Sequence, residues 1–150
     1  MEAIFEIFCH RFKESDERQL VSMADIAQLE ATLEIVLPSD YRSFLMKYGV
    51  VWTPGILDII VDKELELHTL QEFWDMEAII DDKKNGWTTH LDMDLLPFAS
   101  DCMGSIFCFA TAEIRTQSLT AGIYFYDHDY DEVNKISDSF TAWIDCYNKI

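Results

Sequence analysis

The stretch "LPSDYRSFLMKYG", residues 37–49, carries the clearest structural pattern in the chain. Its large apolar side chains recur at the three- and four-residue spacing of a single helix face: Tyr41, Phe44, Leu45 and Tyr48. Pro38 suits the start of a helix, because the N–H that proline lacks would have no helical partner there. Gly49 suits the left-handed position that ends many helices. The stretch therefore predicts a helix with one face in the core.

Helices are also expected in three further segments: residues 1–14, a segment beginning at Ser22, and residues 136–150. Ser22 and Asp25 have the spacing of a capping box, in which each side chain accepts a hydrogen bond from the other residue's backbone N–H. Ser137 or Ser139 is expected to cap the last helix. Trp143 falls on the apolar face of that helix, so we expect it in the core.

The segment after residue 49 predicts strands followed by another helix. Three strands are expected there: residues 50–53, 55–61 and 65–69. Pro54-Gly55 is the expected turn between the first two. Thr69 and Glu72 have capping-box spacing and would open a helix that ends at the Asn85-Gly86 turn.

Three more strands are expected in the second half of the chain: residues 95–100, 105–111 and 122–127. Residues 105–111 are apolar on both faces, which is typical of a strand in the middle of a sheet. The order of elements predicts a single α+β domain over residues 1–150, with helices covering one sheet.

Net charge is the unusual property of this composition. The 150 residues include 28 acids and 11 bases, which gives a net charge of -17, and 49% of them are hydrophobic. Such a surface repels nucleic acid and anionic membranes and attracts cationic partners. The four cysteines have no regular spacing, and no apolar run approaches the roughly 18 residues of a membrane span. We therefore expect a cytoplasmic protein with reduced thiols, no bound nucleic acid and no membrane contact.

Four blocks of the sequence, in this order, resemble the SMI1/KNR4 family of the SUKH superfamily: "IAQLEATLEIVLPSDYRSFLMKYG" (26–49), "LLPFASDCMGSIFCFAT" (95–111), "IYFYDHD" (123–129) and "SDSFTAWI" (137–144). The resemblance spans roughly residues 22 to 146. It implies a mostly antiparallel central sheet covered by helices, and a protein that binds other proteins. Residues 62–94 match nothing in the family pattern, and variation there would fit a surface that selects the partner.

The resemblance also implies two possible roles. Most bacterial members look like immunity proteins, which neutralise toxins that competing bacteria deliver to one another, and many of those toxins are nucleases. Eukaryotic relatives are linked to cell-wall regulation. Our hypothesis is an immunity protein that binds a cationic toxin in the cytoplasm of the producing bacterium. The alternative is a regulatory scaffold without a toxin partner, and the sequence leaves the oligomeric state open.

The acidic run "YDHDYDE", residues 126–132, raises the question of a metal or catalytic site. Asp127, Asp129 and Asp131 fit the first ligands of a calcium loop. Glu132 stands where that loop needs glycine, and Asp138 stands where it needs a bidentate glutamate. The chain also lacks the common nucleophile, phosphate-loop and zinc motifs. We therefore expect no metal, no cofactor and no enzyme activity.

A partner surface and a solvated loop remain as interpretations of the acidic run. His128 either belongs to that surface or is held by the start of a neighbouring helix. Trp52 and Trp87 flank predicted turns and could be exposed anchors, because tryptophan is common in binding hot spots. The candidate partner-binding residues are Asp127, Asp129, Asp131, Glu132, Asp138, Trp52 and Trp87.

Overall fold

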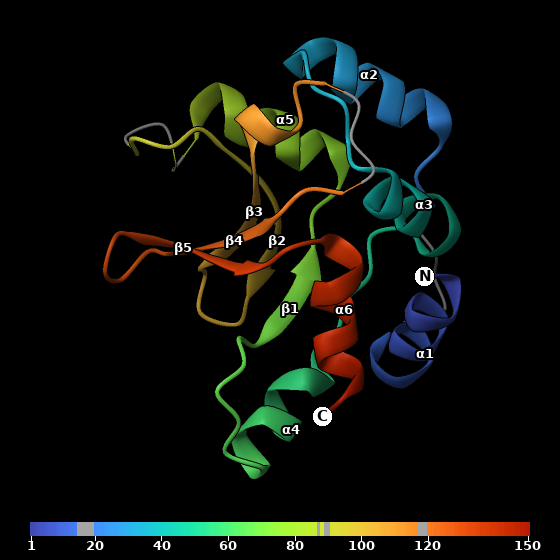
Figure 1. Cartoon of the computed structure of the whole chain (residues 1–150), viewed down its shortest axis with the longest axis vertical. Coiled ribbons are helices and arrows are strands. Elements are labelled where there is room, and N and C mark those ends of the chain that lie inside the picture. The colour runs from blue at the N-terminus through green and yellow to red at the C-terminus, as the bar shows by residue number, and fades with distance from the viewer. Residues whose placement is uncertain (15–19, 87, 89–90, 117–119) are drawn as a thin grey trace.

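The structure is a computed structural model that describes residues 1–14, 20–86, 88, 91–116 and 120–150 (Figure 1). The described residues form six α-helices, one 3-10 helix and five strands: α1 (Glu2–Phe12), α2 (Met23–Leu33), α3 (Ser39–Tyr48), α4 (Gly55–Asp62), β1 (Leu70–Phe73), α5 (Met76–Asn85), β2 (Leu95–Asp101), β3 (Ile106–Ala110), η1 (Thr111–Glu113), β4 (Ile123–Asp127), β5 (Glu132–Ser137) and α6 (Phe140–Asn148).

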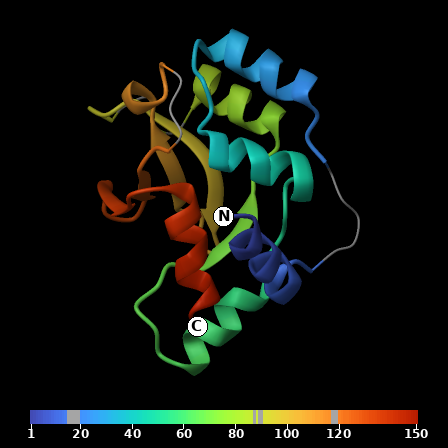
Figure 2. The same cartoon turned by 45° about the vertical axis from the view of Figure 1, so that its right-hand side comes forward.

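The five strands make one sheet in the order β1-β2-β3-β4-β5, and every neighbouring pair is antiparallel. Helices α1, α3 and α6 lie together on one side of this sheet, which we call its first face (Figures 1 and 2). The predicted α+β fold, with helices packed on an antiparallel sheet, is confirmed.

An aromatic core fills the space between the first face and these helices. Tyr41 of α3 contacts both Phe98 of β2 and Phe109 of β3, with ring centroids 5.3 and 5.2 Å apart. Trp143 is 2% exposed and packs on Phe107 at 4.9 Å, which places the last helix over the centre of the sheet. The expectation that Trp143 lies in the core is therefore confirmed.

Most of the helix ends expected from the sequence agree with the structure. Ser22 and Asp25 form both bonds of the capping box, and Ser139 caps α6 by accepting a hydrogen bond from the backbone N–H of Ala142 at 3.0 Å. Gly49 ends α3 with a φ of 78°, a conformation that favours glycine.

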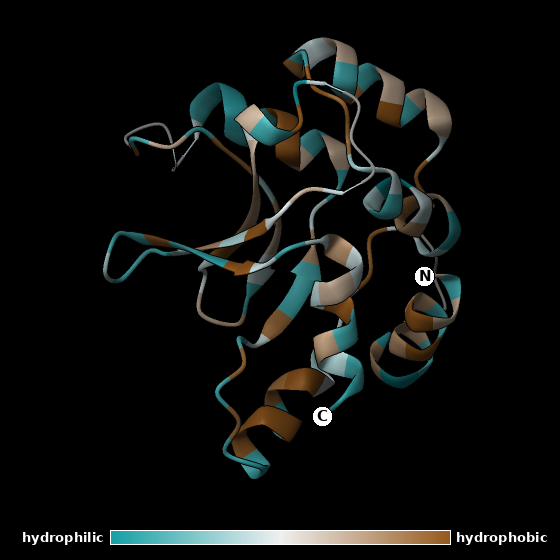
Figure 3. Ribbon diagram, viewed as in Figure 1, coloured by the Kyte–Doolittle hydropathy of each residue, from teal (hydrophilic) through white to brown (hydrophobic). Residues whose placement is uncertain are grey.

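Residues 55–61, expected as a strand, form helix α4 instead. Pro54 is the residue before the helix, so the expected hairpin turn is absent. Ile56 and Ile60 are buried four residues apart on one helix face, while Val61 is exposed. A short apolar run fits either a strand or a buried helix, and here packing decides for the helix. Figure 3 shows α4 as hydrophobic along most of its length.

The region expected to form a helix from residue 70 contains strand β1 instead. Leu70–Phe73 pairs with β2, and the helix begins only at Met76. Asp75, rather than Thr69, caps α5 by accepting a hydrogen bond from the backbone N–H of Ala78 at 2.8 Å. The strand forms because residues 70–73 pair with β2, which lies more than 20 positions later in the chain. The local capping-box spacing carries no information about that pairing and is misleading here.

Two other strand expectations are wrong, and the sequence patterns do not predict strand β5. In residues 50–53, Trp52 makes one isolated bridge to Glu72, and residues 65–69 form no strand. Four of the six side chains of β5 are polar and none is buried, as suits the outermost strand of a sheet, so the strand lacks the apolar alternation that would identify it.

Candidate functional site

The second face of the sheet, opposite α1, α3 and α6, carries a groove of about 770 Å³ beside α5. Below it lies a small apolar cluster built on Leu95, Ile106, Cys108 and Tyr126. The groove is lined by Glu72, Phe73, Trp74, Asp75, Ala78, Asp81, Asp82, Asn85, Gly86, Ser100, Gly104, Ile106, Tyr126 and His128. Residues 62–94, which lie outside the four sequence blocks that resemble the family, supply most of this lining.

One row of paired residues crosses the sheet on the second face: Trp52, Glu72, Ser100, Ile106, Tyr126 and Val133. Directly opposed residues of antiparallel strands project to the same face of the sheet. Trp52, which is 48% exposed, therefore lies on the groove side, next to Glu72. This pairing places the exposed ring of Trp52 beside Glu72, one of the residues that line the groove.

The groove is strongly negative. Four carboxylates line it, and no lysine or arginine occurs among its described lining residues. Asp75 caps α5 by accepting a hydrogen bond from the backbone N–H of Ala78, and Asp82 is buried. The other two carboxylates, Glu72 and Asp81, are exposed. The carboxyl end of α5 also lies at the groove, and a helix end of that polarity attracts cations. The electrostatics of the groove therefore favour a cation over an anion.

His128 joins the β4–β5 hairpin to the β2–β3 turn. The backbone N–H of His128 donates to Ser105 Oγ at 3.3 Å, and Ser105 Oγ lies 2.9 Å from His128 Nδ1. When the hydroxyl donates to Nδ1, both contacts are satisfied and the ring proton is on Nε2, 3.4 Å from Asp129 Oδ1. His128 therefore bonds a neighbouring turn rather than the start of a helix.

Ser105, His128 and Asp129 are the residue types of a hydrolase triad, but their arrangement is structural. Ser105 is 3% exposed, so its hydroxyl has almost no access to a substrate. The same oxygen already accepts the backbone N–H of His128. A catalytic serine must present its oxygen to the bond it attacks. Ser105 and His128 instead hold the β2–β3 turn and the β4–β5 hairpin together, and we call this pair the Ser105–His128 clamp.

The acids of the hairpin differ in what they do. Asp127 Oδ1 accepts the backbone N–H of Asp129 at 3.0 Å, which shapes the turn. Asp131 has a φ of 53° and accepts the hydroxyl of Tyr126 at 2.6 Å. That hydrogen bond is the main reason that the pKa of Tyr126 is raised to about 12. Asp129 and Glu132 are exposed and reach solvent at the hairpin.

The remaining predicted residues are scattered. The carboxylate of Asp138 is almost fully exposed and pairs with Lys135 at 3.2 Å, just before α6. Trp87 lies outside the described residues. Sequence reasoning did not select Glu72, Trp74 and Asp81, which line the groove. The sequence signal that could have identified them was their position in residues 62–94, the segment in which variation would fit a surface that selects the partner.

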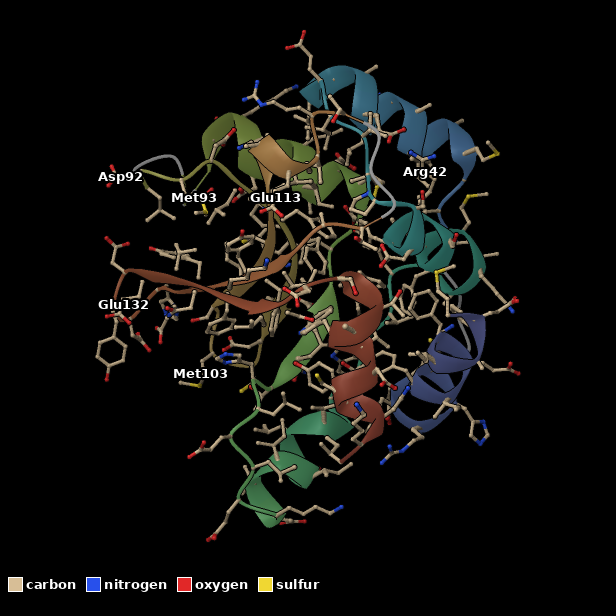
Figure 4. All side chains as sticks on the ribbon, in the orientation of Figure 1. Arg42, Asp92, Met93, Met103, Glu113 and Glu132 are labelled. Atoms are coloured by element: carbon tan, nitrogen blue, oxygen red, sulfur yellow. The ribbon has the colours of Figure 1, made fainter. Side chains whose placement is uncertain are left out.

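Exposed apolar side chains occur in the segments around the groove. Trp52 stands next to Glu72, Met103 is adjacent to the lining residue Gly104, and Tyr130 is in the same hairpin turn as His128. Met93 belongs to the segment between α5 and β2. In Figure 4, Met93, Met103 and Glu132 project to the same side of the molecule. Exposed apolar side chains around a concave site are typical of a protein-binding surface.

The described residues contain no cluster of three histidine, cysteine, aspartate or glutamate side chains suited to a metal ion. Within the same residues, no helix has the length and apolar character needed to cross a membrane.

A comparison with protein-family models matches residues 20–146 to the SMI1 / KNR4 family (SUKH-1). The chain belongs to this family. The SMI1/KNR4 match includes every residue that lines the groove and leaves α1 outside it. A comparison with curated proteins finds no match.

Proposed function

We propose that this SMI1/KNR4 protein is an immunity protein that binds and neutralises a cationic toxin domain in the bacterium that produces both. One observation carries the proposal: the groove on the second face is lined by four carboxylates and, among its described residues, by no lysine or arginine. Family membership supports a protein-binding role, and the net charge of -17 favours a basic partner.

Neutralisation would follow from occupying the toxin's basic surface. A nuclease holds its substrate with lysine and arginine side chains that contact phosphates. Carboxylates pair with the same side chains, and arginine does so through two parallel hydrogen bonds. The acidic protein would then exclude nucleic acid from the toxin without any chemical step. We accordingly propose a binding protein and not an enzyme.

A pull-down tests the proposal directly. The tagged protein is incubated with lysate of its native organism in moderate salt, and bound proteins are identified. We expect a basic toxin domain, bound near one to one and released by high salt. The recovered protein is then expressed in a host cell with and without this chain. Growth arrest that this chain relieves supports immunity. Recovery of cell-wall or signalling proteins, with no toxicity, favours the regulatory scaffold and contradicts the proposal.

A further inference from the structure

We propose that the groove on the second face binds an arginine side chain carried by a short segment of the partner protein. The inference rests on the proposed function only in requiring a protein partner. It names the surface that makes the contact and the side chain that enters it.

The charge of the groove selects a cation, and its geometry favours a planar one. Glu72 on β1 and Asp81 on α5 are exposed carboxylates on two different walls of the groove. A guanidinium offers donors on several edges and can bond carboxylates on both sides, whereas an ammonium acts as a compact point charge. A charged group held between two such walls stays paired as water is excluded.

An aromatic ring adds a second reason for arginine. Trp74 lines the groove and is only partly buried, and guanidinium planes stack on aromatic faces. Tyr126 also lines the groove but is 5% exposed, so it supports the floor rather than offering a ring face. The hydroxyl of Tyr126 donates to Asp131, and the backbone N–H of Trp74 donates to the carbonyl of Phe98 at 2.9 Å. These bonds fix the backbone of Trp74 and the hydroxyl of Tyr126 before a partner arrives, so the floor of the groove needs little ordering on binding.

The size of the groove indicates a segment rather than a single side chain. A volume of about 770 Å³ is within the range of sites that enclose drug-sized ligands. The partner's residues on either side of its arginine would contact exposed apolar side chains of this chain around the groove: Trp52, Met93, Met103 and Tyr130. The acids would then set which side chain enters, and the apolar contacts would set how long the complex lasts.

The first test uses a small probe and needs no partner. The ¹⁵N-labelled protein is titrated with N-acetyl-arginine methylamide, and N-acetyl-lysine methylamide serves as the matched ammonium probe. We expect saturable NMR shifts at the backbone amides of residues 72–75 and 78–86, at arginine probe concentrations on the order of 10 mM. The lysine probe should bind more weakly. Shifts spread over the whole acidic surface, or equal binding of both probes, would overturn the proposal.

Matched variants separate the groove from general acidity. Glu72→Gln with Asp81→Asn removes two charges from the groove, and neither residue caps a helix. Asp62→Asn with Glu66→Gln removes two charges from exposed positions that do not line it. The groove variant should weaken arginine binding about tenfold, and the control should leave it unchanged. Equal effects of the two variants would contradict the proposal.

The co-expression experiment distinguishes this inference from the proposed function. If the natural chain protects cells and the groove variant does so equally well at matched expression, immunity stands and the groove assignment is wrong. If the natural chain does not protect against its captured partner, the proposed function fails. The arginine site is then judged by the NMR titration alone.

Discussion

Asp40 and Thr141 are joined by two hydrogen bonds although 101 positions separate them in the sequence. The Asp40 carboxylate accepts the backbone N–H of Thr141 at 3.1 Å and its hydroxyl at 3.0 Å. Asp40 is 2% exposed and lies in the first turn of α3, while Thr141 lies in the first turn of α6. A carboxylate at the amino end of a helix also meets its favourable dipole. Helices α3 and α6 are therefore fixed to each other at one point over the first face.

Removal of this carboxylate should destabilise the fold. We expect Asp40→Ala to lower the free energy of unfolding by roughly 2–4 kcal/mol, because charge-assisted hydrogen bonds are lost in a buried place. Asp40→Asn should cost less, since its amide oxygen still accepts. Urea unfolding of Asp40→Ala, Thr141→Ala and the double variant measures the coupling. A coupling energy below about 0.5 kcal/mol would mean that the pair does not act as a unit.

The Ser105–His128 clamp should stabilise the two turns. Ser105→Ala removes the partner of the His128 ring and of its backbone N–H, so we expect a loss of about 1–2 kcal/mol. Amide hydrogen exchange should become faster in residues 127–132. Ser43→Ala, at an exposed position of α3, is the control and should stay within about 0.5 kcal/mol of the unmodified protein. Unchanged exchange at the hairpin would show that the clamp contributes little.

Exposed acids of the hairpin should speed association with a basic partner. Asp129 and Glu132 are better choices for charge reversal than Asp131, because Asp131 also holds the hydroxyl of Tyr126. Asp129→Lys with Glu132→Lys should lower the association rate constant and flatten its dependence on salt. Stopped-flow mixing with the captured partner measures both quantities.

A control with the same change in net charge completes that experiment. Glu6→Lys with Asp62→Lys alters exposed positions on α1 and α4, which lie away from the hairpin (Figure 1). We expect a smaller effect on the association rate. If both pairs slow association equally, net charge rather than the hairpin steers the partner.

Trp52 should matter for binding more than for stability. Its side chain is 48% exposed and stands on the groove side of the sheet. Trp52→Ala is expected to change the free energy of unfolding by less than about 1 kcal/mol. An aromatic anchor at an interface contributes about 2 kcal/mol or more, so affinity for the captured partner should fall at least about thirtyfold. Calorimetry of binding checks this, and unchanged affinity would exclude Trp52 from the interface.

His68 should make stability depend on pH. Its ring stacks on Phe125 with centroids 3.7 Å apart, and burial lowers its pKa from the ordinary value, although Asp101 and Asp127 oppose the shift. The unfolded chain therefore binds a proton more readily than the folded protein below about pH 6.5. As pH falls from about 7.5 to 5.5, this residue should progressively lower the free energy of unfolding.

The His68→Phe variant isolates that effect from the other titrating groups. It keeps an aromatic ring against Phe125 and removes the titration. The loss of stability between about pH 7.5 and 5.5 should be smaller in the variant than in the unmodified protein. Denaturant unfolding at several pH values gives both curves, and parallel curves would contradict the assignment.

Strong local patterns in the amino-acid sequence are sufficient to predict most of the fold. The helix at residues 39–48, the capping box at Ser22 and the central strand at 106–110 each have a periodicity or cap that depends only on neighbouring residues. Residues 55–61 form a helix in place of the expected strand, because a short apolar run fits both. Residues 70–73 form a strand in place of the expected helix start, because the capping-box spacing of Thr69 and Glu72 is misleading there. Their state depends on which surface they pack against.

The candidate site could be predicted only in part. The acidic hairpin stands out because its charges are close together in the chain, yet two of its acids shape the hairpin itself. Glu72, Trp74 and Asp81 carry no motif and come together with Tyr126 only when β1 pairs with β2 and α5 packs beside the sheet.

The sequence by itself determined the α+β class, the family, the negative charge and the caps of several helices, since these depend on composition and on contacts between near neighbours. Only the tertiary structure decided which face of the sheet carries the groove, which acids line it, and that Trp52 stands beside Glu72. Those features arise from strand pairing between distant segments, and local periodicity carries no information about such pairing.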